Sequence, residues 1–396
     1  MRILLLCPGM HPRDGGPPRT VSGSAMALKR AGIAVEIATI GRPEDEVETR
    51  ARWSALSGAG VPIHIFPRDF PYVIGRSIAL KRFLRKEASR FDLLHVHCIW
   101  ETALADGAAI FRRRGKPTMV SAHGMLDRWQ MQRSALKKAL AMRFLGTGAM
   151  LDGADGVLYG TQEEAGEAEP LALASRVVIM PNGVEPWLAG SEGAGDQILI
   201  RFPVVRGWKR TILFFSRMHP KKGVDLLVEA FERLQPYFPD AGLLIAAIAQ
   251  DKNYGDAIRE KIAEYKTANI VLVNEPDGLK AEDVFAIADI FCLPSHQEGF
   301  SQAILEAAAA SLPELITDKC HIPEIQEFGA GFVVPDTVDG IEGGLRALLA
   351  MDDEALSVMG QNGKRLVDGS YTWDRIAQRL IDAYQNVISK RSLQQV

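Results

Sequence analysis

The fold of this chain can be predicted outward from residues 289–313, which have the sequence DIFCLPSHQEGFSQAILEAAAASLP. The apolar run at 290–293 predicts a short buried strand, and the Ala-rich run after Ser301 consists largely of strong helix formers. Ser301 itself suits the N-cap of that helix. A strand, a Gly-containing loop and a helix N-terminus can together hold an anion, because the first helical amides lack intrahelical acceptors.

Two carboxylates flank this helix start. Glu298 lies in the loop and Glu306 lies about one turn inside the predicted helix, so the two are separated by roughly 10 Å. Such a pair suits a long ligand with hydroxyls at both ends and negative charge between them, as in a nucleotide-sugar. The alternative is an ordinary amphipathic helix with two solvated glutamates, and this stretch alone favours neither interpretation.

The composition is that of a globular protein with two or three domains. The chain has 396 residues, of which 47% are hydrophobic and 24% are charged. No apolar run approaches the ~20 residues of a membrane span, and the opening MRILLLCPG predicts a first strand because its apolar run is too short for a signal peptide. The four cysteines show no C-x-x-C spacing, which predicts reduced thiols in a cytosolic protein: Cys7, Cys98, Cys292 and Cys320.

The net charge of -3 conceals a basic first half. Residues 50–150 contain 18 Lys and Arg against 6 Asp and Glu, concentrated in Arg76–Arg90, Arg112–Lys116 and Arg128–Arg143. This charge predicts contact with anionic lipids at a membrane surface or with a phosphate-bearing acceptor, and solvated helix faces are the alternative. Nucleic acid is disfavoured, because no aromatic interleaving or recognised nucleic-acid motif accompanies the charge.

Apolar and amphipathic segments alternate through the first half. Strands are predicted at Arg2–Cys7, Ala34–Ile40, Ile63–Phe66, Asp92–His97, Lys116–Ser121, Gly156–Tyr159 and Val177–Met180. Helices are predicted at Val21–Ala31, Ser77–Ser89, Thr102–Arg113 and Ser134–Met150. This alternation predicts βαβ units and a parallel sheet.

The alternation restarts after a predicted linker at Glu185–Trp208. Strands are predicted at Thr211–Ser216, Gly242–Ile248, Ile270–Val273, Ile290–Leu293, Glu314–Thr317 and Phe332–Val334. Helices are predicted at Gly223–Leu234, Asn253–Tyr265, Lys280–Ala288 and, at the end of the chain, Asp374–Ile388. The pattern predicts an α/β protein with two Rossmann-like domains that face each other across a cleft.

Ligands of open parallel sheets bind beyond the carboxyl ends of the strands, so residues that follow strands are the candidates. After the first strand comes Asp14-Gly15-Gly16, where glycine permits close approach of the backbone to a ligand, and Thr20 or Ser22 is expected to cap the next helix. The loop lacks G-x-G-x-x-G, and a plain surface loop is the alternative.

Histidines follow or end two further strands. His123, after the strand at 116–121, can donate a hydrogen bond to a sugar hydroxyl or share developing charge, and a purely structural role is the alternative. His95 and His97 face one side of their strand as metal ligands do. No further ligand occurs at matching spacing, so no metal site is predicted.

Two cations lie around the turn after the strand at 211–216. Arg217 and Lys222, within SRMHPKKG, precede a predicted helix. Two cations and helix amides would neutralise a diphosphate, including the charge that develops as it leaves. Surface residues near a turn are the alternative interpretation for this site alone.

Taken together, Arg217, Lys222, Glu298 and Glu306 resemble the donor site of GT-B glycosyltransferases, in particular the large retaining family 4. The resemblance runs through SRMHPKKGVDLLVEAF, IADIFCLPSHQEGFSQAILEA and PNGV, and the E-x7-E spacing that begins at EGF is its most specific part. SAHGMLDRW is similar to bacterial transferases of exopolysaccharide, capsule or O-antigen synthesis.

This resemblance implies a GT-B fold with a C-terminal helix that crosses back to the first domain. Residues 1–184, with the crossing helix at about 374–396, would form the acceptor-binding domain. Residues 185–373 would form the nucleotide-sugar donor-binding domain.

The resemblance also implies roles for single residues. Arg217 and Lys222 would bind the donor diphosphate, Glu306 the ribose hydroxyls, and Glu298 the transferred sugar. The catalytic group would comprise His123, near the reacting carbon, with Glu298, Arg217 and Lys222. The remaining donor-site positions are Gly16 at the phosphate or acceptor, Asn274 and Pro276 at the base, and Gly299, Phe300, Ser301 and Leu305 beside the sugar and phosphate.

Several positions depart from the family pattern. Ser301 stands where glycine is frequent, Asn274 replaces a common glycine, and His321 replaces a common asparagine. These changes leave the donor sugar and base open. Glu314 occupies a strand position that is usually apolar.

The resemblance implies a retaining transfer of a hexose from a UDP- or GDP-sugar to a carbohydrate acceptor, without cofactor or metal. We expect a polyprenyl-diphosphate-linked oligosaccharide as acceptor, and a cytoplasmic enzyme that contacts the membrane peripherally through its basic first domain. A GT-B sugar-nucleotide epimerase or hydrolase would share the donor site but need no sugar acceptor. A non-catalytic nucleotide-sugar-binding partner would bind donor without turnover.

Overall fold

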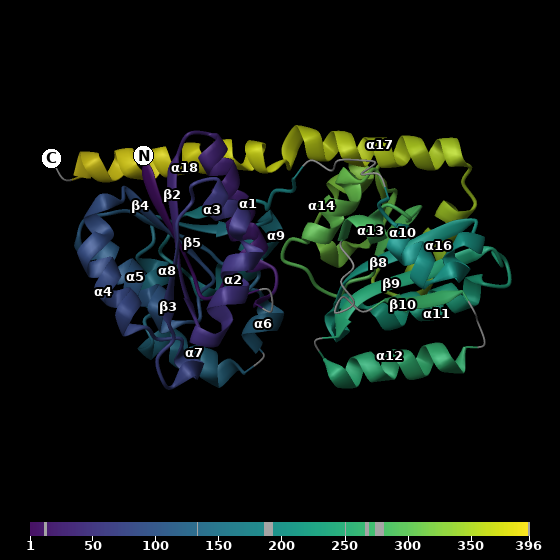
Figure 1. Cartoon of the computed structure of the whole chain (residues 1–396), viewed down its shortest axis with the longest axis horizontal. Coiled ribbons are helices and arrows are strands. Elements are labelled where there is room, and N and C mark those ends of the chain that lie inside the picture. Colours follow the sequence, from purple (N-terminus) through teal and green to yellow (C-terminus); the bar gives the residue numbers. More distant parts are fainter. Residues whose placement is uncertain are drawn as a thin grey trace. The chain divides into compact units, whose positions relative to one another are not determined.

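A computed structural model of the chain describes residues 1–11, 14–132, 134–185, 193–249, 251–265, 269–273 and 281–394. It divides into two compact units (Figure 1). Unit 1 comprises Met1–Gly183 and Thr372–Val396, and unit 2 comprises Val184–Tyr371. Each unit contains one parallel sheet with helices packed on its two faces, so the predicted α/β class with two Rossmann-like domains is confirmed.

The sheet of unit 1 has seven strands in the order β3-β2-β1-β4-β5-β6-β7, and all neighbouring pairs are parallel. Because the order reverses between β1 and β4, their carboxyl ends form the switch point at which such sheets bind ligands. The strands are β1 Arg2–Cys7, β2 Ala34–Gly41, β3 Ile63–Pro67, β4 Leu93–His97, β5 Thr118–Ser121, β6 Gly156–Tyr159 and β7 Val177–Ile179.

Helices cover both faces of this sheet. Their buried apolar side chains form one core with α4, α5, α8 and α9, and a second core with α1, α3 and α18. The helices are α1 Pro17–Arg30, α2 Glu46–Arg52, α3 Ser54–Gly58, α4 Ile78–Glu87, α5 Thr102–Arg113, α6 Arg128–Gln132, α7 Ala135–Phe144, α8 Thr147–Asp152, α9 Gln162–Ala168 and α18 Trp373–Gln394.

Two helices of unit 1 differ in their bounds from the prediction. Helix α1 begins at Pro17 rather than near residue 21, with Gly16 as N-cap, because the fixed φ of proline suits the first helical position. The predicted caps Thr20 and Ser22 therefore lie inside the helix. The single helix predicted at 134–150 is divided into α7 and α8 by Gly146, whose φ of 84° is left-handed.

The last helix, α18, is fastened to unit 1 along its length. Its first residue, Trp373, packs so closely on α1 that a Cβ at Gly23 would lie 2.2 Å from the indole ring. Near its other end, Arg391 forms two hydrogen bonds with Asp155, at 2.7 and 3.1 Å. A glycine on α1 and a bidentate ion pair thus make the C-terminal segment part of the first unit's core.

The sheet of unit 2 has six parallel strands in the order β10-β9-β8-β11-β12-β13, so its order reverses between β8 and β11. The strands are β8 Arg210–Met218, β9 Ala241–Ala249, β10 Ile270–Val273, β11 Ile290–Leu293, β12 Glu314–Thr317 and β13 Gly331–Val334. All six were predicted from the sequence, three of them with the observed bounds.

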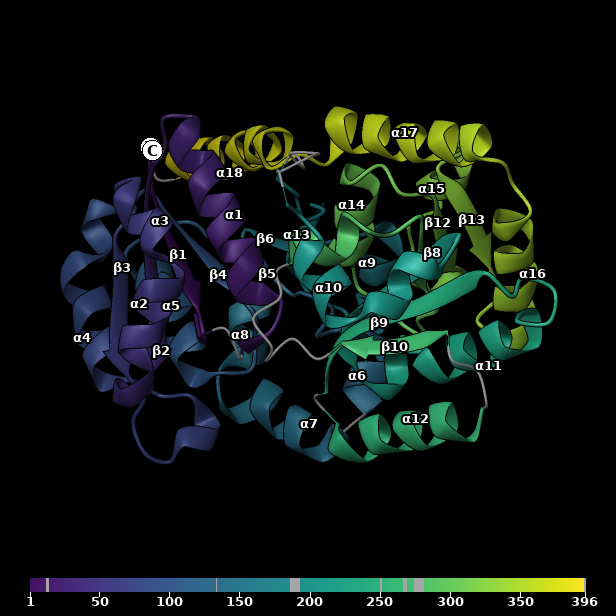
Figure 2. The ribbon, with the colours of Figure 1, turned by 45° about the vertical axis from the view of Figure 1, so that its right-hand side comes forward.

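The helices of unit 2 pack α11 against α16 and α14 against α17, and Figure 2 shows them around the sheet. They are α10 Asp196–Arg201, α11 Val224–Leu234, α12 Lys252–Glu264, α13 Ala281–Phe285, α14 Gln302–Ala309, α15 Glu324–Glu327, α16 Val338–Leu349 and α17 Asp353–Ser370. Helix α10 lies in the segment predicted as a linker. Helices α16 and α17 were not predicted.

Glu314, the first residue of β12, is fully buried between β11 and β13. Neither carboxyl oxygen accepts a well-formed hydrogen bond among the described residues, and the nearby backbone of Ala308 lowers the pKa less than burial raises it. Burial therefore raises the pKa of Glu314 well above its ordinary value, and the carboxyl is neutral where an exposed glutamate would be charged.

We expect Glu314→Gln to change how thermal stability depends on pH. The unfolded chain loses the Glu314 proton near its ordinary pKa of 4.5, whereas the folded chain retains it to higher pH. Wild-type stability should therefore fall relative to the variant as pH rises above about 4.5, and the difference between the two proteins should become independent of pH below about pH 4. Parallel Tm curves for the two proteins from pH 4 to 8 would contradict a buried neutral Glu314.

Candidate functional site

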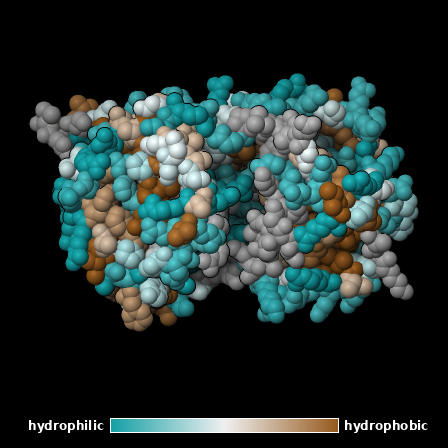
Figure 3. Space-filling view, in the orientation of Figure 1, coloured by the Kyte–Doolittle hydropathy of each residue, from teal (hydrophilic) through white to brown (hydrophobic). Residues whose placement is uncertain are grey.

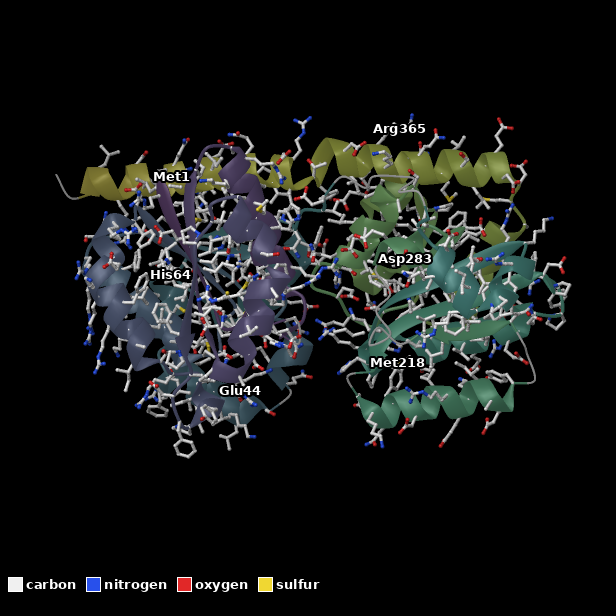
Figure 4. The ribbon with its side chains drawn as sticks, in the orientation of Figure 1. Met1, Glu44, His64, Met218, Asp283 and Arg365 are labelled. Atoms are coloured by element: carbon white, nitrogen blue, oxygen red, sulfur yellow. The ribbon has the colours of Figure 1, made fainter. Side chains whose placement is uncertain are left out.

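The candidate site in unit 2 lies at the carboxyl ends of β8 and β11, where the strand order reverses. Met218, the last residue of β8, marks this edge of the sheet in Figure 4. The turn after β8 carries Lys222, and the loop after β11 carries Glu298. Because the two strands are neighbours, residues far apart in the sequence meet here.

The turn after β8 is shaped by its own side chains. The Nδ1 atom of His219 accepts a hydrogen bond from the N–H of Lys221 at 3.2 Å, and a 3-10 turn, Pro220–Lys222, follows. Gly223 then has a left-handed φ of 64°, and a Cβ there would lie 2.0 Å from the carbonyl oxygen of Pro294. Only glycine permits this contact between the turn and the residue that follows β11.

Across this contact Lys222 and Glu298 form a buried ion pair. Their side chains are 6% and 7% exposed, and the Lys222 Nζ atom pairs with Oε1 of Glu298. The Ser295 hydroxyl donates to the same oxygen at 2.7 Å, and the Glu298 N–H donates to the carbonyl of Lys319 at 3.0 Å. Glu298 is thus held by its backbone and by two side-chain contacts.

Two opposing effects act on the Glu298 carboxyl. Burial alone would raise the pKa of Glu298. The Lys222 ammonium and the hydrogen bonds from Lys222 and Ser295 lower it by more than burial raises it, so the pKa lies below its ordinary value. The group is therefore a carboxylate at neutral pH. A fixed cation and anion, both screened from water, can act on a charged ligand more strongly than exposed groups can.

Arg217 lies inside β8 rather than after it, so this detail of the prediction was wrong. Pairing with β9 continues through Met218, and Arg217 lies opposite Ile248 in the register. The strand is longer than predicted because the whole run Arg210–Met218 pairs with β9. Arg217 is partly buried, three residues before the turn that carries Lys222 begins.

Helix α14 begins where the sequence predicts. Ser301 is its N-cap with extended backbone angles (φ −85°, ψ 120°), although its side chain makes no capping hydrogen bond within the described structure. Glu306 is buried at 6% exposure on this helix, and Leu305 beside it belongs to the hydrophobic core. Phe300 packs at 5.9 Å from the ring of Tyr371, and Gly299 is partly buried.

Asn274 and Pro276, the predicted contacts of the base, lie outside the described residues. Unit 2 therefore brings Lys222 together with Glu298, on neighbouring elements of one switch point. It places Glu306 on the helix that follows the same loop.

The remaining predicted residues, Gly16 and His123, belong to unit 1. At Gly16, the N-cap of α1, an added Cβ would meet no described atom within 4 Å, so space remains beside this backbone. His123 follows β5 with a left-handed φ of 53°. Its Nε2 atom lies 3.0 Å from Nδ1 of His97, and burial lowers the pKa of His123 to about 4.

His97 is a site residue that the sequence analysis did not assign. His95 and His97 do lie on one face of β4, with ring centroids 4.2 Å apart. Among the residues that the structure describes, no three His, Cys, Asp or Glu side chains are arranged to hold a metal ion. His97 pairs with Ser121 in the sheet register, and Ser121 lies two residues before His123. This register brings His97 and His123 together.

Two family models match this chain. The glycosyl transferase 4-like domain matches residues 15–183, and glycosyl transferases group 1 matches residues 197–366. Together they span most of the chain and correspond to the two units.

Curated relatives match over nearly the whole length. The D-inositol 3-phosphate glycosyltransferase of Segniliparus rotundus is 24% identical over 94% of this chain and 84% of its own. The phosphatidyl-myo-inositol mannosyltransferase of Mycolicibacterium smegmatis is 24% identical over 98% of this chain and 94% of its own.

Solved structures share the fold. HepE of Anabaena in complex with UDP-glucose has a TM-score of 0.76 at 15% identity, with 98% of this chain and 100% of that chain covered. The sucrose-phosphate synthase of Thermosynechococcus elongatus has a TM-score of 0.75 at 17% identity, with the same coverage.

The fold, the two matched domains and the named relatives define a class: the chain is an enzyme, a glycosyltransferase. More particularly, it is a GT-B glycosyltransferase of the family 4 type, built from a glycosyl transferase 4-like domain and a group 1 domain. Of the helices within the described ranges, none is both long and apolar enough to cross a membrane.

A double-mutant cycle tests the buried ion pair. Lys222→Met leaves the Glu298 carboxylate buried without its cation and should lower the free energy of unfolding by about 3–5 kcal/mol. Adding Glu298→Gln removes that charge and should recover part of the loss. Urea unfolding of the wild type, both single variants and the double variant measures the coupling. Strict additivity of the two single effects would contradict the ion pair.

Proposed function

We propose that this enzyme transfers a hexose, with retention of anomeric configuration, from a UDP- or GDP-sugar to a carbohydrate acceptor. The observation that carries the proposal is the buried Lys222–Glu298 pair at the switch point of unit 2, beside the N-terminus of α14. A cation, a carboxylate and a helix N-terminus supply the contacts that a sugar diphosphate requires.

Each charged group binds a different part of the nucleotide-sugar donor. Lys222 and Arg217 bind the diphosphate and stabilise the charge that develops as it leaves, which is where fixed cations contribute most to the rate. Glu306, inside α14, accepts hydrogen bonds from the ribose hydroxyls. Glu298, with the backbone at 299–301, binds the hydroxyls of the transferred sugar.

We assign no protein nucleophile to the reaction. The bond between the anomeric carbon and the diphosphate oxygen breaks as the acceptor oxygen bonds to the same face of the sugar. The departing diphosphate oxygen takes the acceptor proton, so charge and protons balance without a metal or cofactor. His123 contributes as a neutral hydrogen-bonding group near the anomeric carbon, since burial lowers its pKa to about 4.

The acceptor in this proposal carries phosphate, and the first candidate is anchored in a membrane. A polyprenyl-diphosphate-linked oligosaccharide fits the similarity of SAHGMLDRW to transferases of surface polysaccharide synthesis. The two relatives named for D-inositol 3-phosphate and for phosphatidyl-myo-inositol support an acceptor with an inositol-phosphate group as the second candidate. Both acceptors place the reaction beside anionic groups, which agrees with the basic first half of the chain.

Helix α7 in unit 1 is the surface proposed for membrane contact. Leu136, Leu140 and Phe144 recur every four residues along it and are 75%, 48% and 69% exposed, so they form one apolar stripe. Lys137 and Arg143 lie on the same helix. Figure 3 shows apolar side chains exposed on unit 1 among hydrophilic ones. An exposed apolar stripe among basic residues fits an anionic lipid surface.

Nucleotide binding tests the donor site. We expect UDP or GDP to raise the Tm of the wild type, and Glu306→Gln to weaken that binding by roughly 10- to 100-fold, because one charge-assisted hydrogen bond contributes roughly 1.5–3 kcal/mol. Calorimetric titration measures the affinity. Glu324→Gln, on the short helix α15, is the matched control and should bind as the wild type does. Equal affinities in all three proteins would contradict the assignment of Glu306.

Product analysis separates the proposed activity from its alternatives. With a UDP- and GDP-sugar panel, transfer should require a polyprenyl-diphosphate oligosaccharide or an inositol-phosphate acceptor. The anomeric proton coupling of the product should show retention. Conversion of the donor without acceptor would identify an epimerase or hydrolase, and binding without any turnover would identify a non-catalytic partner.

Vesicle co-sedimentation tests the surface on α7. Vesicles with 30% phosphatidylglycerol should bind the protein at low salt and release it as the salt concentration rises, because screening shortens the reach of the charges. Replacing Leu136 and Leu140 with serine should reduce binding about 10-fold or more, since each buried leucine contributes ~1.5–3 kcal/mol. Ile200→Ser, at a residue 71% exposed in unit 2, is the control. Absence of binding at low salt would contradict the proposal.

A further inference from the structure

Unit 1 contains a group of polar side chains, here called the histidine cluster, in which His123 is partly buried and the other members are buried: Ser121, His95, His97, His123 and Tyr384. It joins the ends of β4 and β5 to the middle of α18. A polar side chain without a hydrogen bond is costly in an apolar core. Each hydrogen bond in such a group therefore limits which donor and acceptor atoms the neighbouring side chains can use.

The strands determine how the cluster is stacked. His95 and His97 are two residues apart on β4, so their side chains point to the same face of the sheet. Their ring centroids are 4.2 Å apart. After β5, left-handed angles at His123 and Gly124 bend the backbone. The His123 ring lies nearly parallel to that of His97, at 17° and 5.3 Å between centroids.

His95 anchors the cluster because both of its nitrogens are satisfied. Nδ1 lies 2.7 Å from the hydroxyl of Tyr384, and Nε2 lies 2.8 Å from the hydroxyl of Ser121. Tyr384 is fully buried on α18, the helix fastened to unit 1 by Trp373 and Arg391. His95 is thereby fixed, and it supports the ring of His97 from one side.

His97 has only one polar contact in the part of the chain that the structure describes. Its Nδ1 faces Nε2 of His123 at 3.0 Å, and its own Nε2 is buried without a hydrogen-bond partner. Burial lowers the pKa of His97 well below its ordinary value, so the ring is neutral and carries one proton. That proton lies either on Nδ1, in the contact with His123, or on the unpartnered Nε2.

The two tautomers of His97 differ in whether an N–H or a lone pair is left buried without a hydrogen bond. With the proton on Nε2, an N–H donor would be buried without an acceptor, the less common and more costly case of roughly 1–3 kcal/mol. With the proton on Nδ1, the N–H is used in the bond to His123, and only a lone pair remains unmet. The hydrogen-bond inventory therefore favours His97 as the donor.

We propose that His97 is a positioning residue that donates its Nδ1–H to Nε2 of His123 and so fixes the tautomer and orientation of that ring. With Nε2 occupied as an acceptor, the neutral His123 carries its own proton on Nδ1. His123 then offers a donor N–H, the group needed to bind a sugar hydroxyl oxygen or a departing phosphate oxygen. This inference rests on the proposed role of His123, but the tautomer itself can be measured independently.

Nitrogen-15 NMR of histidine-labelled protein tests the tautomer without an activity assay. In the wild type, the His123 signals, assigned by their loss in His123→Gln, should show a protonated Nδ1 and an unprotonated Nε2. His97→Phe retains a ring between His95 and His123 but removes the donor, so the His123 proton should move to Nε2. His97→Asn places an amide N–H near the position of Nδ1 and should restore the wild-type pattern.

Turnover should follow the same order. His97→Phe should lower kcat about 10-fold or more with little change in the donor KM, because the wrong tautomer impairs the step and not the binding. His97→Asn should recover most of the loss. His64→Phe, which changes a partly buried histidine paired with Glu36 in the same unit, is the control for both measurements (Figure 4).

A wild-type His123 with its proton on Nε2 would overturn the proposal, whatever the variants do. Equal kcat in the wild type, His97→Phe and His97→Asn would also overturn the positioning role. If instead His123→Gln retains full activity while the wild-type tautomer is as stated, the proposed role of His123 fails and the tautomer assignment stands. The two failures are thus distinguishable.

Discussion

The site in unit 2 depends on the close backbone approach of the turn after β8 to the loop after β11, where Gly223 meets the carbonyl oxygen of Pro294 and the His296 N–H donates to the carbonyl of Lys221 at 2.8 Å. A side chain at position 223 would separate the turn after β8 from the loop after β11, and Lys222 would no longer reach Glu298. The contact is available because β8 and β11 are neighbours at the point where the strand order reverses. Charges are therefore fixed before a donor binds, which is how preorganised groups assist a transfer.

Unit 1 carries a different kind of polar group at the carboxyl ends of two neighbouring strands, β4 and β5. Its polar groups at the ends of β4 and β5 are neutral histidines, because burial lowers their pKa values, whereas unit 2 presents a charged pair. A charged pair suits a diphosphate, and a neutral donor suits a sugar hydroxyl. Through Tyr384, the last helix of the chain supports the histidines, so a segment that is remote in the sequence contributes to the site.

Much of the fold could be predicted because short apolar runs bounded by polar residues define parallel strands, as in β10, β11 and β12. Helix α16 was missed, since three of its residues are glycines and its pattern is weak. The sequence identified Lys222 and Glu298 separately. Their ion pair could not be predicted, because it depends on strand order. The sequence analysis considered His97 only as a metal ligand and predicted no metal site. The contact of His97 with His123 could not be predicted, because it depends on the register of β4 and β5.

We infer that the turn after β8 and the loop after β11 form one donor site, and hydrogen–deuterium exchange with and without UDP or GDP tests this inference. Nucleotide should slow exchange at residues 221–223 and 299–303 together, while exchange in the edge strand β13 and in helix α16 should remain unchanged. Protection confined to other parts of the chain, or to only one of these two segments, would show that they do not form one donor site.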